Sequence, residues 1–273
     1  MNRSEGWVPV AGGRLPYEIE GEGTGVVLAH AGIADMRMWD PQWAPVAARH
    51  RVARYDLRGF GRADVEATRF SNRADLIAVM DAAGLERAVL VGCSRAGSIA
   101  LDTALEYPDR VSGVAWVCGG ISGFEVEETR EEAELTRREE AMFEAKDWGA
   151  AADFAVELWV DGIGQPAGRG PEPVRALVRR MCFETFVQEK PYGDTIILDP
   201  PAVGRLGEIR VPLLAIAGEL DPPATAAAAA LLAAQVAGAR RIDLPDVAHL
   251  PNLERPEWFT ATLLAFLAEV DAR

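Results

Sequence analysis

Residues 88–101 read A-V-L-V-G-C-S-R-A-G-S-I-A-L, and this stretch decides the predicted fold. Four apolar residues at its start indicate a buried strand, and a helical pattern begins at Ser98. Ser94 stands at the turn between them. Its small neighbours leave room for a crowded backbone; these are Gly92, Ala96 and Gly97. Such a turn is typical of a serine nucleophile, although an ordinary serine N-cap would leave a similar pattern.

Length and composition limit the classes of protein to which the chain can belong. The 273 residues suffice for one large α/β domain with an insertion, or for two small domains. The net charge of −14 argues against a nucleic-acid partner, because binding to phosphates needs basic patches. No apolar run approaches the ~20 residues of a membrane helix, and the first residues lack the apolar core of a signal peptide. We therefore expect neither a nucleic-acid nor a membrane partner.

The number and spacing of the cysteines predict the cellular compartment of the protein. The three cysteines, Cys93, Cys118 and Cys182, form no even disulfide framework and no paired metal-binding spacing. This pattern predicts a protein of the reducing cytoplasm. The oligomeric state stays open.

Apolar strand patterns alternate with helical patterns along most of the chain. The predicted strands of the sheet are residues 25–29, 51–56, 88–91, 111–117, 212–218 and 239–244. In the last predicted helix, Phe259, Leu263, Phe266 and Val270 repeat at steps of four and three, which marks a buried stripe. This alternation predicts an α/β fold with a mostly parallel central sheet and helices on both faces. Ligand chemistry is then expected at the carboxyl ends of the strands.

The alternation of strand and helix patterns ends near Gly119. Residues 125–144 are rich in charge and favour a helix, residues 147–160 carry several large apolar side chains, and residues 171–186 form another helical segment. Strand signals are absent until Val211. We therefore predict a helical cap at residues 119–205, inserted into a core domain made of residues 1–118 and 206–273. The large apolar residues of the cap would form its own core or the walls of a pocket; they are Trp148, Phe154, Trp159, Met181, Phe183 and Phe186.

A serine hydroxyl needs a base to become a nucleophile at neutral pH, and the chain has three histidines. His50 stands at a helix-to-strand junction, at the far end of the sheet from Ser94. His30 ends a strand on the correct edge, but Ala31 and Gly32 follow it as in an anion-binding turn. His249 lies in the loop after the last strand, from which it can reach Ser94. We predict His249 as the base; the alternative is a histidine of a surface loop.

The base in turn needs a carboxylate on its other ring nitrogen. Asp221 follows a strand that ends at Gly218, and two prolines stiffen the turn behind it. Asp246 is too near His249 in sequence to approach the far side of the ring easily, and Glu219 points elsewhere if Asp221 points inward. We predict Asp221 as the orienting acid; the alternative is a helix N-cap aspartate.

The order Ser94, Asp221, His249 in this setting resembles the α/β-hydrolase superfamily. The resemblance covers nearly the whole chain and includes the runs LAHAG (residues 28–32), MWDPQ (38–42), YDLRGFG (55–61), GELD (218–221) and HLPNLERP (249–256). Within the superfamily the chain looks like the capped esterase, lactonase and perhydrolase branch, which has relatives that hydrolyse carbon–carbon bonds. Ala96 departs from the last glycine of the family's Gly-x-Ser-x-Gly pattern. Haloalkane dehalogenases and epoxide hydrolases of this fold have an aspartate at position 94, so Ser94 argues against both.

The resemblance also implies an oxyanion hole. Its two donors would be the backbone N–H groups of Gly32 and Arg95, although Ala31 replaces the glycine usual in the family. It implies a structural role for His30. The Arg95 side chain is unusual beside the nucleophile and suggests recognition of an anionic group on the substrate. The alternative is an outward arginine that is paired with a nearby carboxylate.

Together these residues predict a serine hydrolase that acts on a small or medium ester, lactone or thioester through an acyl-enzyme on Ser94. His249 is the general base and acid, Asp221 orients it, and no metal or organic cofactor is required. A carbon–carbon bond hydrolase or a perhydrolase would use the same triad. A non-catalytic ligand receptor on the same scaffold is the alternative from another class of protein.

Overall fold

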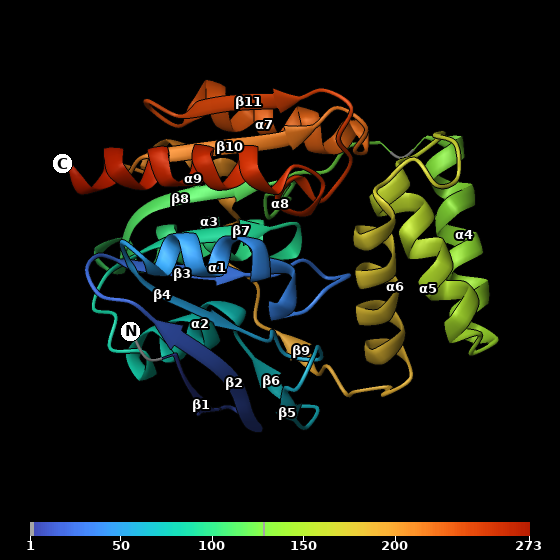
Figure 1. Ribbon diagram of the computed structural model, residues 1–273, viewed down its shortest axis with the longest axis horizontal. Helices are drawn as coiled ribbons and strands as arrows, with labels where there is room; N and C mark the ends of the chain where they lie inside the picture. Colours follow the sequence, from blue (N-terminus) through green and yellow to red (C-terminus); the bar gives the residue numbers. More distant parts are fainter. Residues whose placement is uncertain (1–2, 128) are drawn as a thin grey trace.

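A twisted, mostly parallel sheet forms the centre of the computed structural model, which describes residues 3–127 and 129–273 (Figure 1). From β4 to β11 all neighbouring strands are parallel, whereas β1 and β2 add an antiparallel hairpin at one edge. In spatial order the strands are β1 (Ser4–Val10), β2 (Gly13–Glu20), β4 (Arg51–Tyr55), β3 (Gly25–Ala29), β7 (Ala88–Cys93), β8 (Val111–Val117), β10 (Leu213–Gly218) and β11 (Arg240–Leu244), and β5 (Asp64–Val65) pairs with β2.

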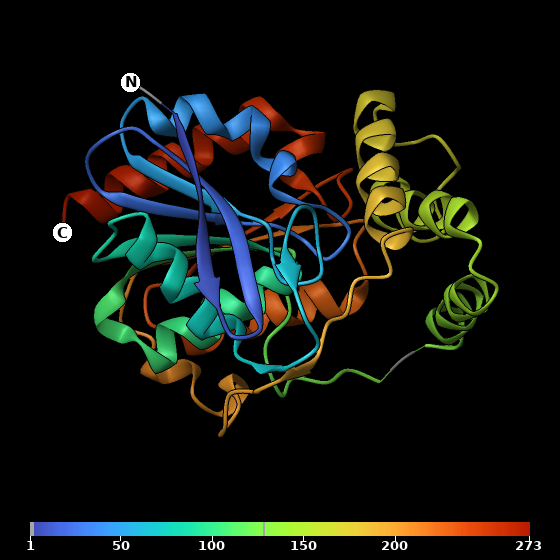
Figure 2. The ribbon, with the colours of Figure 1, turned by 90° about the horizontal axis from the view of Figure 1, so that it is seen from below.

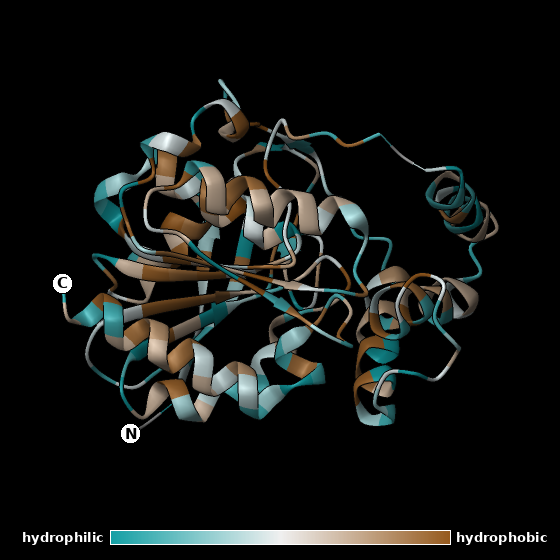
Figure 3. Cartoon of the chain, turned by 90° about the horizontal axis from the view of Figure 1, so that it is seen from above, coloured by the Kyte–Doolittle hydropathy of each residue, from teal (hydrophilic) through white to brown (hydrophobic). Residues whose placement is uncertain are grey.

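Helices cover both faces of this sheet, and Figure 3 shows the apolar strands between them. One face packs against α2 (Asn72–Ala82), α3 (Arg95–Glu106) and α7 (Pro223–Gln235). The other face packs against α1 (Asp40–Ala47), α8 (Pro251–Glu254) and α9 (Pro256–Asp271). The predicted α/β architecture is thereby confirmed. Short helical turns complete the chain: η1 (Met36–Trp39), η2 (Pro108–Arg110), η4 (Ala202–Gly204) and η5 (Leu206–Glu208).

Local sequence signals explain where several helices begin and which face they bury. Ser71 caps α2, since its hydroxyl accepts the N–H of Ala74 at 3.3 Å. All four residues of the predicted stripe on α9 are buried against the sheet. None of the described helices has both the length and the apolar character that crossing a bilayer requires.

Three helices gather at one end of the sheet, beyond the carboxyl ends of its parallel strands (Figures 1 and 2). They are α4 (Arg130–Glu144), α5 (Trp148–Val156) and α6 (Glu172–Phe186), and a short π-helical turn, η3 (Glu157–Asp161), follows α5. Helices α5 and α6 contribute to the same apolar cluster as α1 and α9, so they extend the core of one face of the sheet. Helix α4 has no buried residue and begins with a capping box of Thr129 and Glu132.

The expectation that no strand lies between Gly119 and Val211 was wrong. A two-residue strand, β9 (Asp194–Thr195), pairs in parallel with β6 (Arg69–Phe70). So short a strand shows no periodicity in the sequence, and its pairing depends on a distant segment. The pairing returns the chain to the core after α6 and brings Tyr192 next to Phe70, with ring centroids 5.2 Å apart.

Candidate active site

Ser94 occupies a strained turn between β7 and α3, as the sequence predicts. Its φ of +54° is unusual for a residue with a side chain, and such conformations cluster at functional sites. Gly92 is needed for this turn, because a Cβ atom there would lie 2.2 Å from the carbonyl oxygen of Ala96. The Ser94 N–H donates to Val117 O at 2.8 Å, which ties the turn to β8. Ser94 makes no side-chain capping bond to α3, so the hydroxyl does not serve as an N-cap.

Asp221 and His249 meet at the carboxyl edge of the sheet. Asp221 follows β10, His249 lies in the loop between β11 and α8, and Asp221 Oδ1 lies 2.7 Å from His249 Nδ1. Both side chains are buried: that of His249 is 6% exposed and that of Asp221 is 1% exposed. At this distance a carboxylate selects the tautomer with the proton on Nδ1, which leaves Nε2 free to accept a proton.

The second oxygen of Asp221, Oδ2, is buried and has no hydrogen-bond partner among the described residues. Pro222 and Pro223, the next two residues, have no N–H to donate to it. The Cys118 thiol lies close by: its Sγ and the ligand atoms of Asp221 and His249 are within 4.8 Å of one another. Burial raises the pKa of this thiol well above its usual value, so it stays protonated beside the carboxylate.

The helical segment after α5 holds the loop that carries His249. The His249 N–H donates to Trp159 O at 3.2 Å, and the Trp159 ring lies against the imidazole with centroids 4.5 Å apart. Trp159 belongs to the π-helical turn η3, a rare conformation that is often found at functional sites. The sequence placed Trp159 only among candidate wall or core residues, because its carbonyl partner cannot be deduced from its residue type.

A buried ion pair ties the same loop further. Arg169 Nη2 donates to Glu254 Oε2 at 2.6 Å, and its Nη1 donates to Asp246 O at 2.9 Å. Glu254 in turn accepts the N–H of Ala248 at 3.0 Å. The Glu254 side chain is only 2% exposed, so this pair is well shielded from solvent. The backbone on both sides of His249 is thereby fixed by contacts from outside its own loop.

The other two histidines are engaged elsewhere. His30 Nε2 accepts the N–H of Leu57 at 2.8 Å, and its Nδ1 lies 2.8 Å from Ala31 O. Both nitrogens are thus used to hold two loops at the carboxyl edge. His50 lies at the opposite edge, where Nε2 is 3.1 Å from Asp271 Oδ2. His30 thus lacks the carboxylate partner of a catalytic base, and His50, which has one, lies at the edge of the sheet opposite to Ser94.

The Ser94 hydroxyl makes no hydrogen bond to His249 within the part of the chain that the structure describes. The side chain of Cys93, the residue before Ser94, reaches His249 O with an Sγ···O distance of 3.7 Å. Contacts between nucleophile and base are often long in enzymes without substrate and shorten when substrate binds.

Arg95 follows Ser94 directly, and Gly32 lies beside the Arg95 side chain. Arg95 is the first residue of α3, so its N–H has no acceptor within the helix. Gly32 lies in the turn after β3, and its N–H has no hydrogen-bond partner among the described residues. The two residues are neighbours in space, because a Cβ atom on Gly32 would lie 3.3 Å from Arg95 Nε.

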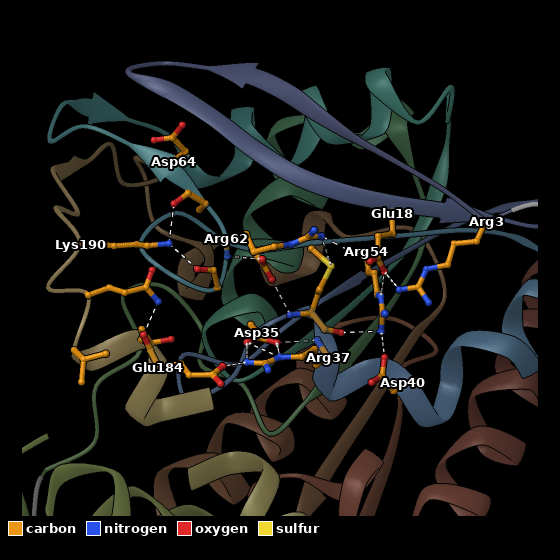
Figure 4. Close-up of a pocket in the computed structure, with 17 residues that line it drawn as sticks. Arg3, Glu18, Asp35, Arg37, Asp40, Arg54, Arg62, Asp64, Glu184 and Lys190 are labelled. Atoms are coloured by element: carbon orange, nitrogen blue, oxygen red, sulfur yellow. Dashed lines mark hydrogen bonds and ion pairs between the residues drawn. The ribbon is translucent and has the colours of Figure 1, made fainter. Parts of the chain in front are cut away.

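Two cavities border the carboxyl edge of the sheet. The larger, about 960 Å³, is lined by charged side chains that pair with one another, such as Arg37 with Asp35 and Glu184 (Figure 4). Neither Ser94, Asp221 nor His249 lines it. The smaller, about 330 Å³, lies between α4, the turn η3 and α7, and its walls include Trp159 and Pro222, which adjoin the Asp221–His249 pair.

The sequence model of the alpha/beta hydrolase family matches residues 26–262. The chain belongs to this family. It is 30% identical over 271 residues to a RutD protein of Azorhizobium caulinodans, described as a candidate carbamate hydrolase, and the match covers 94% of this chain and 96% of that protein. It is 26% identical to a 3-oxoadipate enol-lactonase of Acinetobacter baylyi, over 90% of this chain and 89% of that enzyme. These matches confirm the predicted superfamily and an α/β-hydrolase enzyme of the ester hydrolase type.

Solved structures agree on the fold. The enol-lactonase from Burkholderia xenovorans superimposes with a TM-score of 0.76 at 27% sequence identity, covering 96% of this chain and all of that one. The agreement extends over the core and the helices beyond the sheet edge, since nearly the whole chain is aligned.

Proposed function

We propose that this α/β-hydrolase cleaves a small or medium carboxylic ester, lactone or thioester through an acyl-enzyme on Ser94. The observation that carries the proposal is the buried Asp221–His249 pair at 2.7 Å, at the edge of the sheet where Ser94 stands in its strained turn. A carboxylate at this position keeps the imidazole in the tautomer that can accept the serine proton.

The reaction then follows from the positions of these groups. Ser94 Oγ attacks the substrate carbonyl while His249 Nε2 takes its proton, and the imidazolium is stabilised by Asp221. The proton passes to the leaving group as the acyl–oxygen or acyl–sulfur bond breaks. Water, deprotonated by the same imidazole, attacks the acyl-enzyme and regenerates the hydroxyl. The chemistry requires no metal or organic cofactor.

The N–H groups of Gly32 and Arg95 are proposed to hold the oxyanion of each tetrahedral intermediate. Fixed donors of this kind each contribute about 3 kcal/mol to stabilisation of the transition state. Support comes from the lack of protein acceptors for Gly32 among the described residues and from the position of Arg95 at the start of α3.

Residues 119–205 are proposed to act as a cap on the core domain of residues 1–118 and 206–273. Helices α5 and α6 share an apolar cluster with the core, and Trp159 contacts the base directly. The cap would thus help to exclude water from the site, and a small molecule is the expected substrate. Placement in the cytoplasm fits the three free, buried cysteines.

Labelling with a fluorophosphonate probe tests the proposal, because such probes react only with an activated serine. We expect the native protein to be labelled and Ser94→Ala to be unlabelled. Ser98→Ala, one turn further along α3, is the matched control and should be labelled normally. Equal labelling of Ser94→Ala, or no labelling of the native protein, would contradict the proposal and favour a non-catalytic ligand receptor.

Turnover then separates the possible reactions of this triad. Aryl esters, vinylogous diketones and peracid formation from hydrogen peroxide should be compared with one preparation. We expect the esters to be turned over fastest. Faster turnover of the diketones would reassign the enzyme to carbon–carbon bond hydrolysis.

A further inference from the structure

The guanidinium of Arg95 has no acidic partner. Within the described chain it forms no ion pair, although the protein has 42 acidic residues and most arginines at the carboxyl edge of the sheet are paired. Its one hydrogen bond joins Nη1 to the Tyr192 hydroxyl at 2.8 Å. The alternative of an outward arginine bound to a carboxylate is therefore not what the structure contains.

Aromatic rings hold this guanidinium in place. Its Cζ atom lies 5.5 Å from the centroid of Phe60 and 5.2 Å from that of Tyr192. Tyr192 is itself positioned: its ring packs edge-on against Phe70, and a Cβ atom on Gly59 would come within 3.0 Å of it. Gly59 has a φ of +86°, so both its backbone and its missing side chain make room for the ring. These contacts favour one orientation of the exposed Arg95 side chain before any ligand binds.

The free edge of the guanidinium faces the proposed oxyanion turn. Arg95 Nε and Nη2 have no acceptor among the described residues, and they lie 3.3 Å and 3.9 Å from the position of a Cβ atom on Gly32. These two nitrogens form the fork that binds a carboxylate with two parallel hydrogen bonds. A glycine at position 32 leaves this edge uncovered.

We propose that Arg95, held by Tyr192, binds a carboxylate on the acyl part of the substrate, so that the enzyme prefers monoesters or lactones of dicarboxylic or oxo acids. This inference rests on the proposed function, because it assigns the substrate class of the same site. The anion would sit a short chain length from the carbonyl that Ser94 attacks, since Arg95 is the next residue along the chain. The preference belongs to the side chain of Arg95, whereas the oxyanion role belongs to its backbone.

The test compares two aryl esters of matched length, one with a terminal carboxylate and one with a terminal methyl group. The readout is the ratio of their kcat/KM values, which cancels any effect common to both substrates. We expect Arg95→Met to lower the ratio by about 10- to 100-fold, in line with the loss of a charge-assisted bidentate contact. Tyr192→Phe should lower it several-fold. Arg180→Met, an exposed arginine on α6, is the control for the loss of one positive charge and should leave the ratio unchanged.

A binding measurement makes the inference independent of turnover. In the Ser94→Ala background, monomethyl glutarate should bind by calorimetry, and adding Arg95→Met should weaken that binding at least tenfold. An unchanged ester ratio, or unchanged binding, would overturn the inference while leaving the serine hydrolase intact. Absence of turnover of both esters by the native protein would instead contradict the proposed function. The calorimetric binding measurement would then still decide whether Arg95 binds the carboxylate.

Discussion

His30 and His249 are both buried at the same edge of the sheet, yet their ring nitrogens have different partners. Backbone groups occupy both nitrogens of His30: Leu57 N–H on Nε2 and Ala31 O beside Nδ1. His249 has a carboxylate on Nδ1 and no described partner on Nε2. A neutral ring with both nitrogens engaged can only hold loops together, whereas a ring with one charged partner and one free nitrogen can carry a proton.

The comparison shows that position at the carboxyl edge does not by itself make a catalytic histidine. Burial holds the pKa of the His30 imidazole below its ordinary value, against the opposing attraction of Asp56. Protonation of Nε2 would also break its bond to the Leu57 N–H. His30 is therefore suited to remain neutral and to hold the two loops together, whereas in the proposed mechanism His249 transfers the proton.

The largest expected effect comes from removing the charged partner of His249. Asp221→Asn should lower kcat by about 10⁴-fold, because an amide no longer selects the productive tautomer or stabilises the imidazolium. Steady-state kinetics on an aryl ester measures this loss, and thermal unfolding checks that the fold survives. Activity within tenfold of the native protein would mean that another carboxylate orients the base.

Replacing His30 should damage stability more than chemistry. His30→Ala leaves the Leu57 N–H without its buried acceptor and opens a cavity, so we expect a loss of about 3 kcal/mol in the free energy of unfolding. Urea unfolding measures it. If the folded fraction of this variant lost activity as completely as Asp221→Asn, then His30 would share the proton transfer and the contrast between the two histidines would fail.

The pH dependence of stability sharpens the contrast. In the unfolded chain His30 takes up a proton near pH 6.5, whereas in the folded protein its pKa is lower, so the unfolded state binds more protons as pH falls. Protonation of His30 in the unfolded chain should therefore lower the free energy of unfolding between pH 7 and pH 5, by up to about 2 kcal/mol. Urea unfolding at both values should show this loss in the native protein and a smaller one in His30→Gln. Identical losses would mean that His30 is protonated in the folded state.

The smallest effect is expected from removing the carboxylate partner of His50, the third histidine. Asp271→Asn removes the carboxylate partner of His50, but Asp271 is 37% exposed and lies at the opposite edge of the sheet. We expect a change below about 1 kcal/mol in stability and none in kcat. A loss of activity comparable to that of Asp221→Asn would show that activity does not depend specifically on the Asp221–His249 pair, and would contradict this comparison.

Much of this arrangement could be predicted because it is encoded locally. The turn at Ser94 depends on small residues that are adjacent in sequence, and Asp221 and His249 each follow a predicted strand, which fixes the edge at which they lie. Parallel pairing of buried strands follows from the alternation of strands and helices.

The remaining features depend on partners that are distant in the chain. Nothing about His30 predicts that Leu57 will donate to it, and nothing about Tyr192 predicts that the pairing of β9 with β6 will carry it to Arg95. Arg169 and Glu254 are 85 residues apart and each looks like an ordinary surface charge in sequence. Only the folded chain brings them together.

The bond from the His249 N–H to Trp159 O has a consequence for engineering. Exchanging residues 119–205 for the corresponding segment of another hydrolase would also exchange the backbone acceptor and the aromatic ring that hold the imidazole. Replacement of this proposed cap would then alter the proposed acid–base step along with substrate selectivity. In this protein a transplanted cap should be moved together with the loop of residues 246–254, so that the contacts between the two segments are kept.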